Sequence, residues 1–183
     1  ELATWKDWLA YHVIDQYADV LPKAFADEDF AFFEKTLLGT PQQRPRWQRA
    51  VTVVNEELGD EVGKAYAQKY FPAEAKTRAQ AMVANIVAAF RKRIDAVPWM
   101  TASTKAEAQE KLNQLYVGIG YPETWKDYSG FDVKPDDILG NEWRSSVYEY
   151  QRDLKRIGQT VNRQEWCMTP QTVNAVNLPL QNA

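Results

Sequence analysis

The sequence predicts a mainly α-helical fold, a multi-helix domain followed by a short C-terminal extended segment. Apolar residues recur at steps of three and four along most of the 183 residues, which is the period of an amphipathic helix. Prolines and glycines interrupt these runs where helices are expected to begin or end. The run from Gln171 to Asn177 leaves the helical period and is rich in β-forming residues. We expect it to be an edge strand of a larger protein whose sheet lies outside the chain.

Two helices are predicted before residue 40. An apolar stripe from Trp5 to Tyr17 predicts the first helix, and Pro22 is expected to end it. The acidic triplet 27–29 is expected to begin the second, because carboxylates are favourable near the positive end of the helix dipole. Gly39 is expected to follow its last turn in the left-handed conformation.

Three further boundaries are marked by prolines and one by a glycine. Pro45 is expected near the start of a helix whose apolar face breaks at Gly59. The clearest helix of the chain is predicted between Pro72 and Pro98, with apolar residues at steps of three or four throughout. The pattern Thr-Lys-Ala-Glu at 104–107 predicts a capping box for the helix that follows.

The last predicted helix follows a loop. Residues 118–122, Gly-Ile-Gly-Tyr-Pro, cannot continue a helix, and they lack the spacing, lysine and preceding strand of a phosphate-binding loop. Residues 135–137, Pro-Asp-Asp, are expected to begin a helix whose buried stripe runs from Trp143 to Ile157, and Gly158 is expected to end it.

Large rings are frequent, with seven Trp and nine Tyr. At helical spacing they favour a core packed with aromatic side chains over a box that holds an aromatic cofactor.

Composition excludes several classes of protein. The net charge of −3, from 22 basic and 25 acidic residues, argues against a nucleic-acid-binding protein. A single cysteine allows no internal disulfide, and no apolar run has the length of a membrane span. The only histidine, His12, lies beside the first apolar stripe and is expected to be a partly buried structural residue. One His and one Cys make a catalytic zinc site within the chain improbable.

Several segments, taken in order, resemble those of a known family. They are Lys35–Gly39, Lys69–Pro72, Trp99-Met100 with Thr104-Lys105 and Lys111, Ile119–Pro122, and Glu165–Ala175. Their order and spacing are similar to those of the neprilysin/endothelin-converting-enzyme family of zinc metallopeptidases, in its bacterial oligopeptidase-like branch. The resemblance covers the whole chain but a minority of the family's full length.

The resemblance implies two parts with different roles. Residues 1–158 correspond to part of a helical domain that caps the active-site cleft and restricts entry to small peptides. Residues 159–183 correspond to a linker and to the substrate-binding edge strand of a truncated thermolysin-like α+β catalytic domain. In that strand Asn174 and Ala175 are the expected substrate-binding residues, the first through its side chain and the second through its main chain. An extended peptide would add to the strand edge.

The resemblance also says what the chain lacks. An aromatic pair is expected where Val176 and Asn177 stand, and the H-E-x-x-H helix and the later Glu ligand would lie beyond Ala183. We therefore assign no metal ligand and no catalytic residue to this chain. Zinc is expected in the parent enzyme only, and the chain alone is expected to be inactive. The expected partners are a peptide substrate and the remainder of the catalytic domain, in an extracytoplasmic compartment (periplasmic or secreted) of a bacterium.

An alternative from the pattern alone is a self-contained helical interaction module without catalysis. Its helices would close a core by themselves, and the segment after Gly158 would be a recognition strand or a mobile tail.

Overall fold

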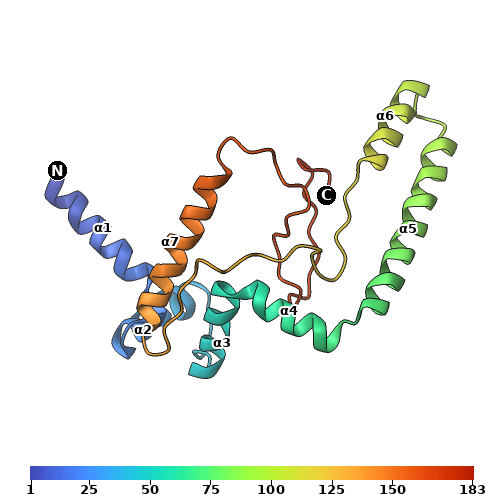
Figure 1. Ribbon diagram of the computed structural model, residues 1–183. Coiled ribbons are helices and arrows are strands. Elements are labelled where there is room, and N and C mark those ends of the chain that lie inside the picture. Colours follow the sequence, from blue (N-terminus) through green and yellow to red (C-terminus); the bar gives the residue numbers. More distant parts are fainter. The chain divides into compact units, whose positions relative to one another are not determined.

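The computed structural model describes all 183 residues, and it is helical without any strand (Figure 1). The elements are α1 (Leu2–Gln16), the 3₁₀ turn η1 (Ala18–Val20), α2 (Lys23–Asp29), the π-helical segment η2 (Phe30–Leu37), α3 (Arg46–Glu57), α4 (Gly59–Tyr70), α5 (Ala73–Ala96), α6 (Ala102–Asn113) and α7 (Ile138–Arg156). The mainly α fold class is confirmed. The chain divides into two units, residues 1–57 with 127–159, and residues 58–126 with 160–183.

In the first unit, the loop before α7 folds back onto that helix. Asp137 caps the helix by accepting a 3.0 Å hydrogen bond from the N–H of Gly140, and its carboxylate also pairs with Arg144. The rings of Tyr128 and Phe131 stack on Tyr148 at centroid distances of 5.9 and 5.8 Å. These contacts explain why α7 begins where the Pro-Asp-Asp pattern predicts.

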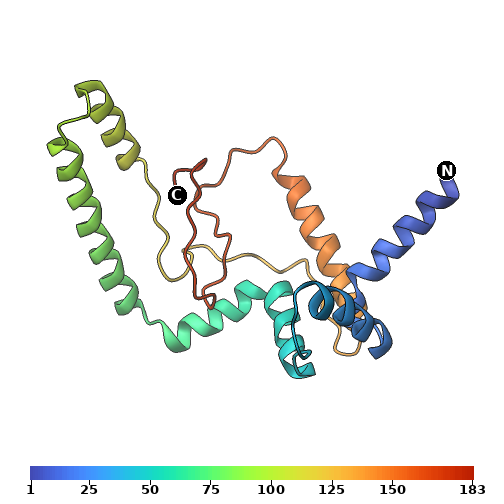
Figure 2. The same ribbon diagram turned by 180° about the vertical axis from the view of Figure 1, so that it is seen from behind.

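In the second unit, α5 and α6 form a helical hairpin (Figures 1 and 2). Arg91 on α5 donates to the side chains of Gln109 and Asn113 on α6, at 3.3 and 2.7 Å. At the turn, Lys105 donates to the carbonyl of Asp95 at 2.6 Å. The two long helices are therefore tied along their length by polar side chains.

The C-terminal segment of the second unit packs on α4. Gly59, Gly63 and Ala67 lie one turn apart and are the buried residues of that helix. A Cβ atom at Gly63 would stand 2.6 Å from Cδ of Pro170, so the missing side chain leaves room for this proline. Gln171 also donates to the carbonyl of Gly59 at 3.2 Å. Residues 169–171 are thus packed against α4, which argues against a tail that is mobile along its whole length.

Most predicted helix ends are confirmed. Helix α5 lies between Pro72 and Pro98, and the helical run is interrupted directly before Gly59, between α3 and α4. Gly39 and Gly158 have φ values of 73° and 78°, the left-handed conformation that ends a helix and that glycine adopts without strain.

Two predicted helix starts are wrong. Helix α2 begins at Lys23, directly after Pro22, so the triplet 27–29 lies in its last turns and not at its start. Pro22 has no N–H and cannot continue the preceding turn, and its carbonyl oxygen accepts a 2.9 Å bond from the N–H of Phe25, so the helix starts directly after it. Helix α6 begins at Ala102, where Thr101 accepts a 3.2 Å bond from the N–H of Thr104, and the expected capping box is not used.

The expected aromatic core does not form. The buried apolar residues are only Tyr17, Ala18, Ala26 and Ala67. The predicted buried stripe of α7 is exposed, with Trp143 at 58% and Tyr150 at 62% of their full accessible area. Helical periodicity predicts which face of a helix is apolar, but it does not predict that another segment covers that face. In this unit no segment covers the apolar face of α7.

The expected strand at 171–177 does not form either. Val173 is fully exposed, and the backbone of Val173 and Val176 makes no hydrogen bond within the chain. A strand requires a partner whose N–H and C=O groups pair with its own, and the chain offers none at this place.

Candidate peptide-binding site

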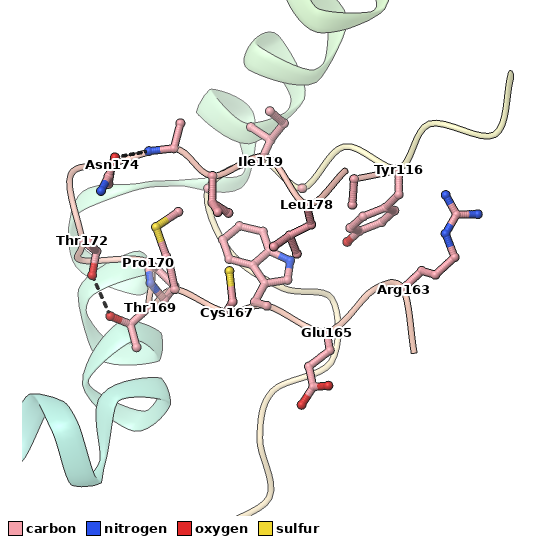
Figure 3. A pocket seen from close by; sticks show the side chains of 17 residues that line it. Tyr116, Ile119, Arg163, Glu165, Cys167, Thr169, Pro170, Thr172, Asn174 and Leu178 are labelled. Carbon is pink, nitrogen blue, oxygen red and sulfur yellow. Dashed lines mark hydrogen bonds between the residues drawn. The ribbon is translucent and has the colours of Figure 1, made fainter. Parts of the chain in front are cut away.

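A cavity in the second unit contains both predicted substrate-binding residues. It has a volume of about 360 Å³ and lies between the loop 116–120 and the C-terminal segment (Figure 3). Asn174 lies at one end of this cavity and Tyr116 at the other, as Figure 3 shows. The structure therefore brings the predicted residues to a hollow that could receive a side chain of a bound molecule.

Glycines let the loop approach the aromatic side chains beside it. A Cβ atom at Gly118 would lie 3.0 Å from the ring of Trp166, and one at Gly120 would lie 2.3 Å from the ring of Phe71. Gly120 also has a φ of 75°, which favours glycine. The indole N–H of Trp166 is buried and finds no acceptor in the chain. The loop and Trp166 thus form one closely fitted wall of the cavity.

Asn174 and Ala175 are exposed and are bonded to each other. The backbone N–H of Ala175 donates a 2.8 Å hydrogen bond to Oδ1 of Asn174, and the N–H of Asn174 donates to the carbonyl of Thr172 at 3.0 Å. The hydroxyls of Thr169 and Thr172 are 3.0 Å apart, which fixes the turn that leads into this segment (Figure 3). The internal bond occupies one lone pair of Oδ1, so the Asn174 amide keeps two N–H donors and a second lone pair with which it can bind a peptide backbone.

Val176 and Asn177 stand where an aromatic pair is expected. Val176 lines the cavity, while the side-chain amide of Asn177 donates to the carbonyl of Ala183 at 3.3 Å. Leu178 and Ala183 exchange backbone hydrogen bonds of 2.8 and 3.3 Å. Asn177 thus stabilises a closed C-terminal turn, where an aromatic side chain was expected.

Arg163 ties this turn to the end of α6. Its guanidinium donates to the carbonyl oxygens of Gln181, Gln114 and Asn182 at 2.8, 2.5 and 3.1 Å. Cys167 lines the cavity as an exposed free thiol. Three further residues of the site were not predicted from the sequence, namely Arg163, Trp166 and Tyr116. The glycines of the loop are the one sequence feature that indicates where the backbone comes close to a ring.

No metal site is formed by these residues. The described chain, Glu1 to Ala183, has no group of three or more His, Cys, Asp or Glu side chains that could hold a metal ion. His12 lies on α1 with its ring 4.1 Å from that of Trp8, and it is exposed where partial burial was expected. None of the helices has the length and apolar character needed to cross a membrane.

Two neighbouring carboxyl groups in the first unit, those of Glu57 and Glu142, have raised pKa values. Burial, the charge of Glu142 and a hydrogen bond with it raise the pKa of Glu57 to about 7, and nearby Glu56 and Glu149 act in the same direction. Burial also raises the pKa of Glu142. The two carboxyls titrate as one coupled pair.

The chain is similar to known metallopeptidases along nearly its whole length. The model of the N-terminal part of peptidase family M13 matches residues 1–122. Neprilysin-3 of Drosophila melanogaster is 31% identical over 98% of the chain, and human endothelin-converting enzyme 1 is 27% identical over 96%. The chain spans about a quarter of these relatives, 24% of the length of each.

Solved structures show the same similarity. The open state of the zinc metalloprotease Zmp1 of Mycobacterium tuberculosis is 41% identical with a TM-score of 0.85, over 98% of this chain and 28% of that one. PepO of Lactobacillus rhamnosis is 30% identical with a TM-score of 0.88, over 97% of this chain and 28% of that one. The sequence match and the shared helical arrangement agree, and the chain belongs to peptidase family M13, the neprilysin-like zinc metallopeptidases.

Proposed function

We propose that these residues are part of a zinc metalloendopeptidase that hydrolyses small peptides. Asn174 and Ala175 bind the backbone of the substrate, and the helices of residues 1–158 restrict access to the cleft. Residues 159–183 are the linker and the segment that pairs as an edge strand with the remainder of a thermolysin-like catalytic domain. The zinc ligands and the residue that activates water lie outside the 183 residues.

The observation that carries this proposal is the place of Asn174 and Ala175. Both are exposed, both line the cavity, and the backbone on either side of them, at Val173 and Val176, has no hydrogen-bond partner in the chain. An extended peptide could pair with this free edge while one of its side chains enters the hollow. The proposed reaction, peptide hydrolysis, rests on membership of the family. The proposed binding mode, pairing of the peptide with the backbone, rests on the free edge.

The test compares the full-length protein with the 183-residue chain. The full-length protein is expected to contain zinc and to cleave a fluorogenic peptide, with cleavage lost on chelation and with preference for short peptides. The chain alone is expected to do neither. Stoichiometric zinc together with turnover in the chain alone would contradict the assignment of the metal site to other residues.

The exposed apolar faces favour a second candidate, a helical interaction module without catalysis. Trp5 and Leu9 on α1 are 60% and 55% exposed, in addition to the rings of α7. Such faces bind protein when they are exposed. A full-length protein that holds no zinc but binds a partner protein through α1 would favour this candidate over the peptidase.

For the compartment, we propose an extracytoplasmic site, periplasmic or secreted. Cell fractionation of the native host checks it, and recovery of the full-length protein with the cytoplasmic fraction would contradict it.

A further inference from the structure

We propose that Lys76 is a positioning residue for the peptide-binding segment, acting through the loop 118–123; this rests on the proposed function. Lys76 lies in the first turn of α5 and retains only 6% of its accessible area. A buried ammonium group is costly unless its donors are satisfied. The partners of this ammonium group therefore indicate its role, and they lie in the loop that forms the cavity wall.

Lys76 makes three contacts, and all of them are with that loop. Its Nζ donates to the carbonyl oxygen of Tyr121 at 2.8 Å and to Oε1 of Glu123 at 2.6 Å. It also stands 4.0 Å from the centroid of the Tyr121 ring, within the range of a cation–π contact. One side chain thus fixes the backbone, the ring and the following acidic residue of a single turn.

Neighbouring rings hold the same turn from other sides. The ring of Tyr121 stacks on Trp125 with an interplanar angle of 14° and meets Phe71 edge-on at 87°. Gly120, directly before it, has no room for a side chain against Phe71. A loop held at so many points cannot shift at Tyr121 without moving Gly120 and Gly118.

The loop in turn contacts the C-terminal segment. Gly118 lies against the ring of Trp166, so the position of the loop determines where that ring can lie. Trp166 precedes the segment that carries Asn174, and both line the same cavity. The path from Lys76 to Asn174 therefore runs through Tyr121, Gly118 and Trp166, all in one unit.

Lys69 provides a matched control. Its Nζ also faces a ring, that of Tyr70 at 5.2 Å, but it is exposed and makes no hydrogen bond to the loop. A change from lysine to methionine removes the same charge and donors at both places while keeping the length of the side chain.

The experiment measures amide hydrogen exchange and peptidase kinetics in the full-length protein. Lys76→Met is expected to speed exchange about tenfold at the hydrogen-bonded amides of the two segments, the effect of losing 1.4 kcal/mol of hydrogen bonding to a charged group. These amides are those of Tyr116, Tyr121, Thr172, Asn174 and Ala175. Exchange in α6 and in the first unit is expected to stay unchanged. KM is expected to rise about tenfold with kcat unchanged, as for loss of binding geometry alone. Lys69→Met is expected to change neither measurement.

Glu123→Gln keeps the test informative if Lys76→Met does not fold. The Glu123 side chain is 77% exposed, so this variant folds, and a smaller change of the same sign is expected. Unchanged exchange at the amides of Thr172, Asn174 and Ala175 would overturn the proposal, as would faster exchange with unchanged KM in an active enzyme. A wild-type protein without peptidase activity would overturn the proposed function, and exchange alone would then decide whether Lys76 positions the segment.

Discussion

The backbone N–H of Ala175 donates a 2.8 Å hydrogen bond to the side-chain oxygen of Asn174. These are the two groups proposed to bind a substrate backbone, and in the free chain they satisfy each other. A peptide that bonds to the N–H of Ala175 must displace this bond, which costs about 1 kcal/mol, whereas the side-chain NH2 of Asn174 stays available. The internal bond also keeps the exposed edge from presenting two unsatisfied groups to another chain.

Packing of the C-terminal segment on α4 depends on Gly63. Gly63→Ala would place Cβ 2.6 Å from Cδ of Pro170, and such overpacking costs about 1–3 kcal/mol. Arg163 is the only Lys or Arg between residues 160 and 183, so tryptic cleavage after it reports release of the segment. We expect cleavage to become about tenfold faster.

The matched control is Gly130→Ala, whose Cβ would meet only Cε2 of Tyr148 at 4.0 Å. This control is expected to leave cleavage after Arg163 unchanged. Equal cleavage rates in the Gly63 variant and the wild type would show that the segment does not depend on this contact.

Gly120 combines a left-handed backbone with close packing on Phe71. Gly120→Ala is expected to destabilise the second unit by about 2–4 kcal/mol, because about 1–2 kcal/mol of backbone strain adds to the clash. Gly39→Ala has a similar φ of 73° but meets nothing within 4 Å. It is expected to cost only the strain of about 1–2 kcal/mol. Urea denaturation measures both losses, and equal values would argue against the fit between the loop and Phe71.

The Glu57–Glu142 pair predicts a dependence of stability on pH. Because the pKa of Glu57 rises from 4.5 to about 7 on folding, its contribution to stability is complete below pH 4.5 and is lost as the pH rises through 7. Glu57→Gln imitates the protonated carboxyl. It is expected to raise the free energy of unfolding by roughly 1–2 kcal/mol at pH 8, a value discounted for partial exposure, and by little at pH 4.5.

Thermal unfolding of the variant at the two pH values checks this prediction, with the exposed Glu61→Gln as control. An equal change for the Glu57 variant at both pH values would show that the two carboxyls do not share a proton.

Helix ends could be predicted from the sequence where one residue decides the backbone locally. Gly39 and Gly158 adopt the left-handed conformation as expected, and Pro72 and Pro98 enclose α5. The start of α2 could not be predicted from its charges, because Pro22 ends the preceding turn and its carbonyl oxygen accepts the first bond of the helix. Burial could not be predicted either, because the period of an apolar stripe does not say which segment covers it.

The candidate site was predictable in part. The resemblance pointed to Asn174 and Ala175, and both line the cavity, while their role in binding substrate stays a prediction. The contributions of Lys76 and Trp166 depend on contacts between segments 45 or more residues apart along the chain, from Lys76 to Tyr121 and from Gly118 to Trp166. Contacts between segments so far apart leave no periodic pattern in a single sequence, so they could not be predicted from it.

The most direct test of the account is the effect of Asn174→Ala on peptide hydrolysis by the full-length protein. Asn162→Ala is the matched control, because Asn162 also accepts a bond from a nearby backbone N–H, that of Gln164 at 3.0 Å, and lies in the same unit. The account predicts that Asn174→Ala loses about 1–3 kcal/mol in kcat/KM, roughly fivefold to 150-fold, while Asn162→Ala is unaffected. Equal kcat/KM values for the wild type and the Asn174 variant across several peptides would contradict it.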